Sequence, residues 1–134
     1  MNTIPETQNL FYQNLGKLFY AIAAVDKVIR VEEVKKLKQL VNTEWLNLGG
    51  GKDKSEIDAM RQIKITFDQL AAKIQNPNDR MADFKLFKNT HEDLFTDDVK
   101  QLIWKTASAI TTSFSGRNKS ELILLAELGI ILKS

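Results

Sequence analysis

Cysteine is absent from this sequence of 134 residues, and histidine occurs once and proline twice. Without cysteine the chain can form neither disulfides nor Cys-based zinc sites, and thiol chemistry is excluded. The net charge is only +2, from 19 basic and 17 acidic residues, which is too small to indicate nucleic acid as a partner. No apolar run approaches the ~20 residues that span a bilayer. The opening residues, MNTIPETQNL, lack the basic and apolar regions of a signal peptide. We therefore expect a cytoplasmic protein that binds neither nucleic acid nor membrane.

Apolar residues make up 43% of the chain, enough for one domain with one core. They recur at intervals of three and four residues, which is typical of amphipathic helices, and no segment alternates with a period of two. The first three stripes are Phe11, Leu15, Leu18, Ile22 and Val25; Val31, Val34, Leu37, Val41, Trp45 and Leu48; and Ile57, Met60, Ile63, Phe67, Leu70 and Ile74. The later stripes are Val99, Leu102, Ile103, Thr106, Ile110 and Phe114, then Leu122, Leu125 and Leu128. Both tryptophans, Trp45 and Trp104, lie on or beside these stripes, so core packing is expected for both.

The breaks between the stripes carry the residues that begin and end helices. Three glycines in the segment 49–54 predict a flexible link, and Ser55 resembles the start of the next helix. Pro77 forbids continuation of the helix before it. Thr96, followed by two aspartates, has the form of a helix N-terminus. We predict one domain spanning residues 1–134, an all-α compact bundle of about six helices built from two helical hairpins around one core.

Two segments of the chain resemble each other and suggest that the two hairpins are related. AIAAVDKVIRVEE (21–33) and AITTSFSGRNKSE (109–121) both begin with Ala-Ile and end in Glu twelve residues later. Each combines an apolar helix end, a short corner and a helix start that bears Glu.

The first segment belongs to a stretch, LGKLFYAIAAVDKVIRVEEVKKLKQLV, that resembles the TerB-like family of tellurite-resistance-associated proteins. The hallmark of that family is an apolar helix ending in Ala-x-x-Asp-Gly-x-Val/Ile, followed by Glu at the start of the next helix. Asp26, Val28 or Ile29, and Glu33 stand at the matching places, with Lys27 in place of the glycine. The closing stretch, 103–133, is similar to the C-terminal part of small bacterial TerB-like proteins. The resemblance implies an all-helical domain and, in some members, metal binding at acidic residues, but no catalytic mechanism.

The corner after the first stripe allows two interpretations. Asp26, Glu32 and Glu33 could supply three of the several oxygens that Ca²⁺ or Mg²⁺ requires. Alternatively, Asp26 caps free amides of the corner, while Glu32 and Glu33 complement the dipole of the next helix. The ammonium of Lys27, in the same loop, would repel a metal ion and favours the structural interpretation.

No arrangement of residues defines a catalytic centre. His91 has acidic neighbours that could share a transition metal with it, but a single histidine among loop acids is more often solvated. No Gly-x-Ser-x-Gly setting is present, and the glycine run lacks the spacing of a phosphate-binding loop. We expect a non-catalytic accessory or protein-interaction module of the TerB-like kind, tied by the resemblance to stress response, with a protein partner that the sequence does not identify. The alternative is a divalent-metal-binding protein that uses Asp26, Glu32 and Glu33. No oligomeric state can be predicted.

Overall fold

The computed structural model describes residues 5–25, 29–46, 54–73, 75–112 and 119–133, and every regular element in these ranges is helical. The elements are α1 (Pro5–Ala24), α2 (Val31–Leu40), the π-helical turn η1 (Val41–Trp45), α4 (Lys54–Met60), α5 (Gln62–Ala71), α6 (Pro77–Thr90), the 3₁₀ turn η2 (Glu92–Leu94), α7 (Asp97–Thr112) and α8 (Lys119–Lys133). Because α2 runs into η1, and only Arg61 separates α4 from α5, the longer elements form six helical stretches. The prediction of an all-α bundle is confirmed. Among these helices, none is both long enough and apolar enough to cross a bilayer.

One helix start, after Thr96, lies where the sequence predicts it, and another lies at Pro77, which the sequence marks only as the end of the preceding helix. Pro77 is the first residue of α6, and the side chain of Asn76 accepts a hydrogen bond of 2.9 Å from the N–H of Asn78. Proline suits this position because the first N–H of a helix has no partner within the helix. α7 begins directly after Thr96, whose hydroxyl oxygen accepts from the N–H of Val99 at 3.3 Å.

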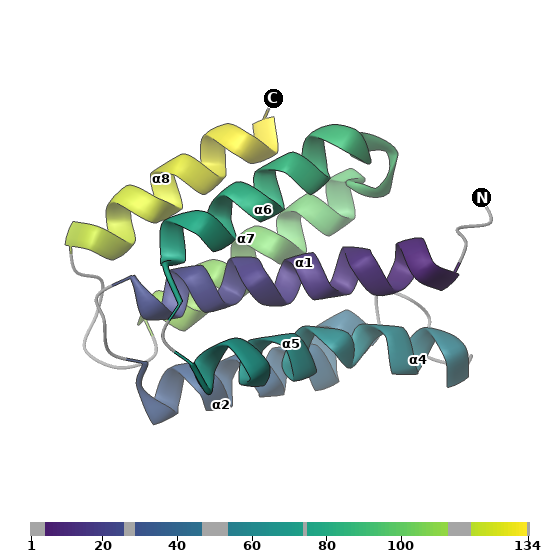
Figure 1. Ribbon diagram of the computed structural model, residues 1–134, viewed down its shortest axis with the longest axis horizontal. Helices are drawn as coiled ribbons and strands as arrows, with labels where there is room; N and C mark the ends of the chain where they lie inside the picture. The colour runs from purple at the N-terminus through teal and green to yellow at the C-terminus, as the bar shows by residue number, and fades with distance from the viewer. Residues whose placement is uncertain (1–4, 26–28, 47–53, 74, 113–118, 134) are drawn as a thin grey trace.

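The central element of the bundle is α1, which packs against α5, α6 and α7 and also contacts α4 and α8. α6 and α5 flank it on opposite sides in Figure 1. Its apolar stripe is buried accordingly, with Leu15, Leu18 and Ile22 fully enclosed. Such all-round coverage explains why a helix with few charges can lie at the centre of the fold.

Gly16 sets the distance between α1 and α5. A Cβ atom at this position would lie 2.7 Å from the backbone oxygen of Ile63 and 2.8 Å from the Cβ of Thr66. Only glycine allows two backbones to approach this closely. One turn further along, the rings of Tyr20 and Phe67 meet edge to face at 6.1 Å, which continues the contact between the two helices.

The π-helical turn η1 places Trp45 in the core. The N–H of Leu46 bonds to the carbonyl of Val41, five residues earlier, which is the spacing of a π turn. Trp45 is buried, as predicted, and its indole N–H donates to the hydroxyl of Thr106 at 3.0 Å. Its ring meets Phe19 edge to face at 6.2 Å, so the side chain joins α1, η1 and α7.

The two hairpins that the sequence relates are α1–α2 and α7–α8. Ala109 stands 88 residues after Ala21, and Glu121 stands 88 residues after Glu33. The same offset pairs residues that are buried in both hairpins: Leu15 with Ile103, Leu18 with Thr106, Ile22 with Ile110, Glu33 with Glu121, Leu37 with Leu125, and Leu40 with Leu128. The contact of α2 with α7 likewise has its counterpart in the contact of α8 with α1. The hairpins thus share one pattern of burial, with α4, α5 and α6 inserted between them.

Some details of the sequence prediction are wrong. Val31 and Leu122, assigned to apolar stripes, are exposed. α4 begins at Lys54, one residue before the expected start at Ser55, and the predicted link thus loses its last residue. The rest of that link, 49–53, lies outside the described residues. So do the stripe residues Leu48, Ile74 and Phe114.

Candidate functional site

The acidic residues predicted for a metal-binding corner have different environments. Asp26 lies outside the described residues. Glu32 and Glu33 both belong to the first turn of α2, as predicted, but Glu32 is exposed whereas Glu33 is only 3% exposed. Within the described ranges, no three His, Asp or Glu side chains gather closely enough to hold a metal ion.

Glu33 has a structural use at the start of α2. Its carboxylate accepts a hydrogen bond of 2.7 Å from the backbone N–H of Arg30, the residue that precedes the helix. Its own N–H donates to the Arg30 carbonyl at 3.0 Å. A carboxylate in this position satisfies a free donor and lies at the positive end of the helix dipole. Glu121 is the third residue of α8, as Glu33 is of α2, and it is equally buried at 3%.

A hollow of about 800 Å³ lies beside this corner, between the ends of α1 and α5 and the start of α6. Its described lining is Tyr20, Ala24, Val25, Ile29, Ala71, Ala72, Lys73, Gln75, Asn76, Pro77 and Asn78. None of these residues is acidic, so the described wall offers no carboxylate to a metal ion. The only charged side chain in this lining is that of Lys73.

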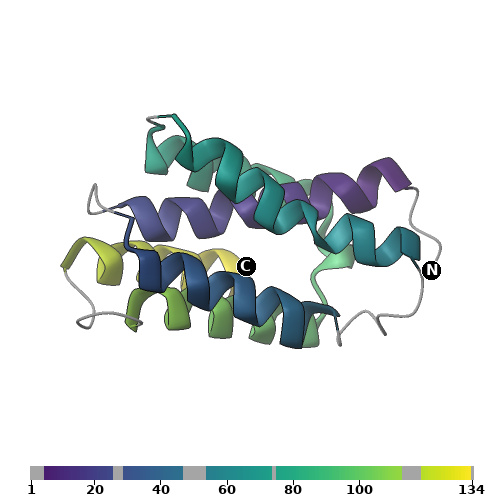
Figure 2. The ribbon, with the colours of Figure 1, turned by 90° about the horizontal axis from the view of Figure 1, so that it is seen from below.

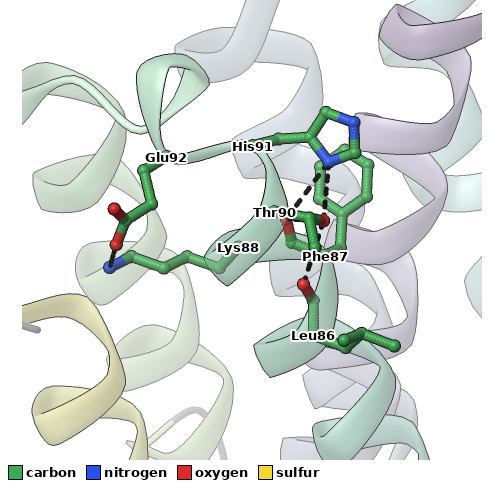
Figure 3. Close-up of polar contacts among 6 residues, drawn as sticks. All are labelled: Leu86, Phe87, Lys88, Thr90, His91 and Glu92. Carbon is green, nitrogen blue, oxygen red and sulfur yellow. Dashed lines mark hydrogen bonds and ion pairs between the residues drawn. The ribbon is translucent and has the colours of Figure 1, made fainter.

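His91 ends α6 and is held by local contacts (Figure 3). Its ring stacks on that of Phe87, with centroids 4.3 Å apart and planes 16° from parallel. Its Nδ1 lies 3.0 Å from the hydroxyl of Thr90 and 3.3 Å from the carbonyl of Phe87. The imidazole is half-buried rather than fully solvated, and one of its two nitrogens is engaged within its own helix end. This arrangement stabilises the end of α6.

Next to it, Lys88 is buried, although lysine rarely is. Its side chain is 1% exposed, and its ammonium lies 3.2 Å from a carboxylate oxygen of Glu92, as Figure 3 shows. Glu92 is 60% exposed, so solvent screens its side of the pair. The pairing explains how a charged group is tolerated at this depth.

Trp104 departs most from the sequence prediction, which placed it in the core. It is 42% exposed and lies on α7 beside α8. Its ring covers Gly129 of α8: a Cβ added to that glycine would lie 3.6 Å from the nearest ring carbon. The neighbouring Ile103 takes the buried position, which turns the indole toward the edge of the bundle.

An open hollow of about 500 Å³ adjoins this tryptophan, and we call it the Trp104 groove. It is lined by Lys100, Gln101 and Trp104 of α7 and by Gly129, Leu132 and Lys133 of α8. The absence of a side chain at Gly129 makes room beside the indole. Two lysines on an apolar groove suit an apolar group that carries, or lies next to, negative charge.

The surface of α8 that continues from this groove is also apolar. Leu122, Ile123 and Ile130 are exposed, and Ile130 reaches 71%. Ile123 and Ile130 are seven residues apart and so share one face, as do Leu122 and Gly129. In Figure 1, α8 lies at the edge of the bundle, and the helices that contact it most are α7 and α1. Large apolar side chains therefore occur on α8 outside its buried face as well as within it, and an apolar helix face is normally covered.

Comparison with known proteins identifies no relative of this chain. No protein-family model, curated protein or solved structure matches the chain. What the protein does must therefore be inferred from its own packing and surface.

Proposed function

We propose that the protein is a non-catalytic interaction module that binds another protein through α8 and the adjoining face of α7. The observation that carries this proposal is the set of exposed large apolar side chains on these two helices. Among the described residues, Leu10, Val31, Ile65, Leu86, Trp104, Leu122, Ile123 and Ile130 are the large apolar residues that are exposed. Half of them lie on α7 and α8, although these two helices make up far less than half of the chain.

Apolar side chains scattered singly over a surface need no explanation, but their concentration on one helix does. Leu122, Ile123 and Ile130 expose apolar surface on α8, and Trp104 exposes an indole next to it on α7. Tryptophan is among the residues that contribute most to protein–protein affinity, because it buries a large area at little entropic cost. These features support a role in binding more than a role in chemistry.

Kinship with TerB-like proteins, and through it a part in a bacterial stress response, belongs to the same proposal. It is supported by the stretch 15–41 and by the helical corner whose second helix begins with a buried glutamate at the family's position, Glu33. A module of this kind acts by holding a partner, so its activity would be lost when its surface is altered, even though the fold is retained.

Site-specific photo-crosslinking in the native host tests the interaction role. A photoreactive amino acid at Ile123, next to Ile130 on the exposed face, is expected to capture one defined protein. The same amino acid at Gln69, exposed on α5 and away from α8, serves as the matched control. The capture should disappear when Ile130 is changed to Glu, which charges the surface without touching the core.

Two outcomes contradict the proposal. The first is an identical set of crosslinked proteins from Ile123 and Gln69, which would mean that the apolar face has no partner of its own. The second is capture from Ile123 that survives Ile130→Glu, which would place the contact elsewhere.

A further inference from the structure

The Trp104 groove has a counterpart in the first hairpin, and there it is filled. The offset of 88 residues relates Trp104 of α7 to Gly16 of α1, and Gln101 to Gln13. α5 packs closely on Gly16. Gln13 donates a hydrogen bond of 3.4 Å to Gln62, at the start of α5. The α7 side of the groove therefore corresponds to the α1 surface that α5 covers.

The correspondence extends to the second helix of each hairpin. α5 also contacts α2 and η1, through an ion pair of 3.4 Å between Lys38 and Asp68 and a hydrogen bond of 3.1 Å from Lys64 to Asn42. Seen from below in Figure 2, α5 and α2 run side by side with α1 behind them. α5 thus packs on α1 and reaches α2 and η1 through two polar contacts at the surface, and the equivalent helices, α7 and α8, form the two walls of the Trp104 groove.

The exposure of equivalent side chains also differs between the hairpin that α5 covers and the second hairpin. Gly16 and Tyr20, which face α5, are buried in the first hairpin. Their equivalents on α7 are Trp104, which is exposed, and Ser108, which is only half-buried. Several positions facing the common core, such as Ile22 and Ile110, are buried in both hairpins, whereas burial differs at these two positions on the side where α5 lies. In the described part of the second hairpin, no helix covers this side.

We propose that the Trp104 groove is a docking site for a single α-helix of a partner protein, bound where α5 would lie if the second hairpin were covered as the first one is. This inference rests on the proposed function and adds the position of the contact and the chemistry of the partner. The partner helix presents one apolar stripe, with a large side chain that enters beside Gly129 and packs on Trp104. Docking of an amphipathic helix into an apolar groove is a common mode of recognition.

The charges of the groove define the flanks of the partner helix. Lys100 and Lys133 are the charged residues of the groove, and the offset relates Lys100 to Tyr12, so a lysine stands where the first hairpin carries an aromatic residue. Both lysines line the groove, one on each helix. A partner helix with acidic residues on both sides of its apolar stripe would complement them, and acids meeting lysines at the rim would favour this partner over basic helices.

A second copy of the chain suits the surface less well. In an antiparallel pair of α8 helices, Lys119 of one copy would approach Lys133 of the other, and the two Glu127 side chains would meet near the centre. Like charges so placed oppose pairing. A lipid surface is also less suitable, because Glu127 is exposed between Ile123 and Ile130 and because a groove receives a protruding side chain better than a flat bilayer.

Selection from a peptide library tests the inference. The probes are displayed peptides of the combined length of α4 and α5, with the apolar stripe of α5 kept and all other positions randomised, selected on the folded full-length protein. Enriched peptides are expected to be acidic on both flanks of the stripe. Their affinity, measured by calorimetry, should fall by about tenfold or more in the double variant Lys100→Glu, Lys133→Glu. It should fall similarly in Gly129→Leu, which fills the groove, and it should decrease with added salt.

Lys85→Glu is the matched control, since Lys85 is an exposed lysine on α6, and it should leave the affinity unchanged. Enriched peptides that carry no excess of acid, or that bind the double lysine variant as tightly as wild type, would overturn the partner chemistry. Failure to enrich any peptide would overturn the helix-docking site itself. The interaction role would still stand if crosslinking from Ile123 succeeded, so the two failures can be told apart.

Two further measurements address the other occupants. Co-sedimentation with vesicles of phosphatidylserine and phosphatidylcholine is expected to show no binding. Binding that is lost in Trp104→Ala would overturn the proposal and show that the groove binds a membrane instead of a partner helix. Light scattering is expected to give the mass of one chain. A dimer that dissociates in Ile130→Glu would overturn the proposal and show that a second copy of the chain, and not a partner helix, covers this face.

Discussion

The close approach of α1 and α5 at Gly16 leads to an unusual prediction: replacing a glycine within a helix by alanine should destabilise the protein. In a helix interior, alanine is ordinarily favoured over glycine by about 0.5–1 kcal/mol. At Gly16 the added Cβ would lie 2.7 Å from a backbone oxygen, whereas ordinary contact begins at 3.4 Å, so the helices must separate by 0.7 Å. Neither the oxygen of Ile63 nor the Cβ of Thr66 can move away by changing a rotamer. Overpacking of this kind costs about 1–3 kcal/mol, which leaves a net loss of up to about 2.5 kcal/mol after the gain in helix propensity.

Gly129 provides the matched control for this experiment. It also lies within a helix, but a Cβ there would be 3.6 Å from the Trp104 ring, an ordinary contact. Gly129→Ala should therefore raise the free energy of unfolding by about 0.5–1 kcal/mol, while Gly16→Ala lowers it. Urea unfolding monitored by circular dichroism measures both, with an unchanged slope showing that the same surface is exposed in each variant. Equal stabilisation by the two substitutions would refute the packing that the structure assigns to Gly16.

Three other substitutions or additions test separate parts of the structure. Ile22→Ala removes a fully buried side chain from α1 and should lower the free energy of unfolding by about 2–5 kcal/mol; an unchanged urea midpoint would contradict its place in the core. Thr106→Val removes the acceptor of the buried Trp45 indole and should cost about 1–3 kcal/mol, with a change in tryptophan fluorescence as an independent sign of the altered contact. Because the carboxylate of Glu33 already accepts a backbone hydrogen bond, added Ca²⁺ should leave the melting temperature unchanged in calorimetry. A rise that disappears in Asp26→Asn would instead favour the metal-binding alternative.

Most of the fold could be predicted because the core of this protein is defined by helical periodicity. The stripe that contains Leu15, Leu18 and Ile22 is buried as a unit, since residues three and four apart necessarily share a helix face. The role of Glu33 at a helix start was also predictable, because the positive end of the helix dipole stabilises a negative charge in the first turn of any helix. The repeat between the two hairpins could be found from the spacing of Ala-Ile and Glu alone.

The exposed face of α8 could not be predicted in this way. α8 is apolar on nearly every side, so periodicity cannot distinguish the stripe with Leu124 and Leu128, which is buried, from the stripe with Leu122, which is not. Trp104 was misplaced for a related reason: a tryptophan beside an apolar stripe suits a core, but among the described residues no helix covers that side of α7. Burial of an apolar residue depends on a neighbouring element, and local sequence carries no information about whether that element exists.

The π-helical turn at Val41–Trp45 also bears on how the length of this chain can change. A π turn accommodates one residue more than an α turn, so a helix can absorb an insertion there without rotating its later residues. If Thr43, which is exposed, were deleted, Trp45 would come to lie seven residues after Leu37, the interval at which two side chains share a face of an ordinary α-helix. The indole could then still meet Thr106. The same deletion in the middle of α1 would instead turn half of that helix away from the core. The position of Trp45 in the core therefore depends on the number of helical turns at η1 and not on the number of residues. A sequence one residue shorter at this point can keep the same tryptophan in the same place.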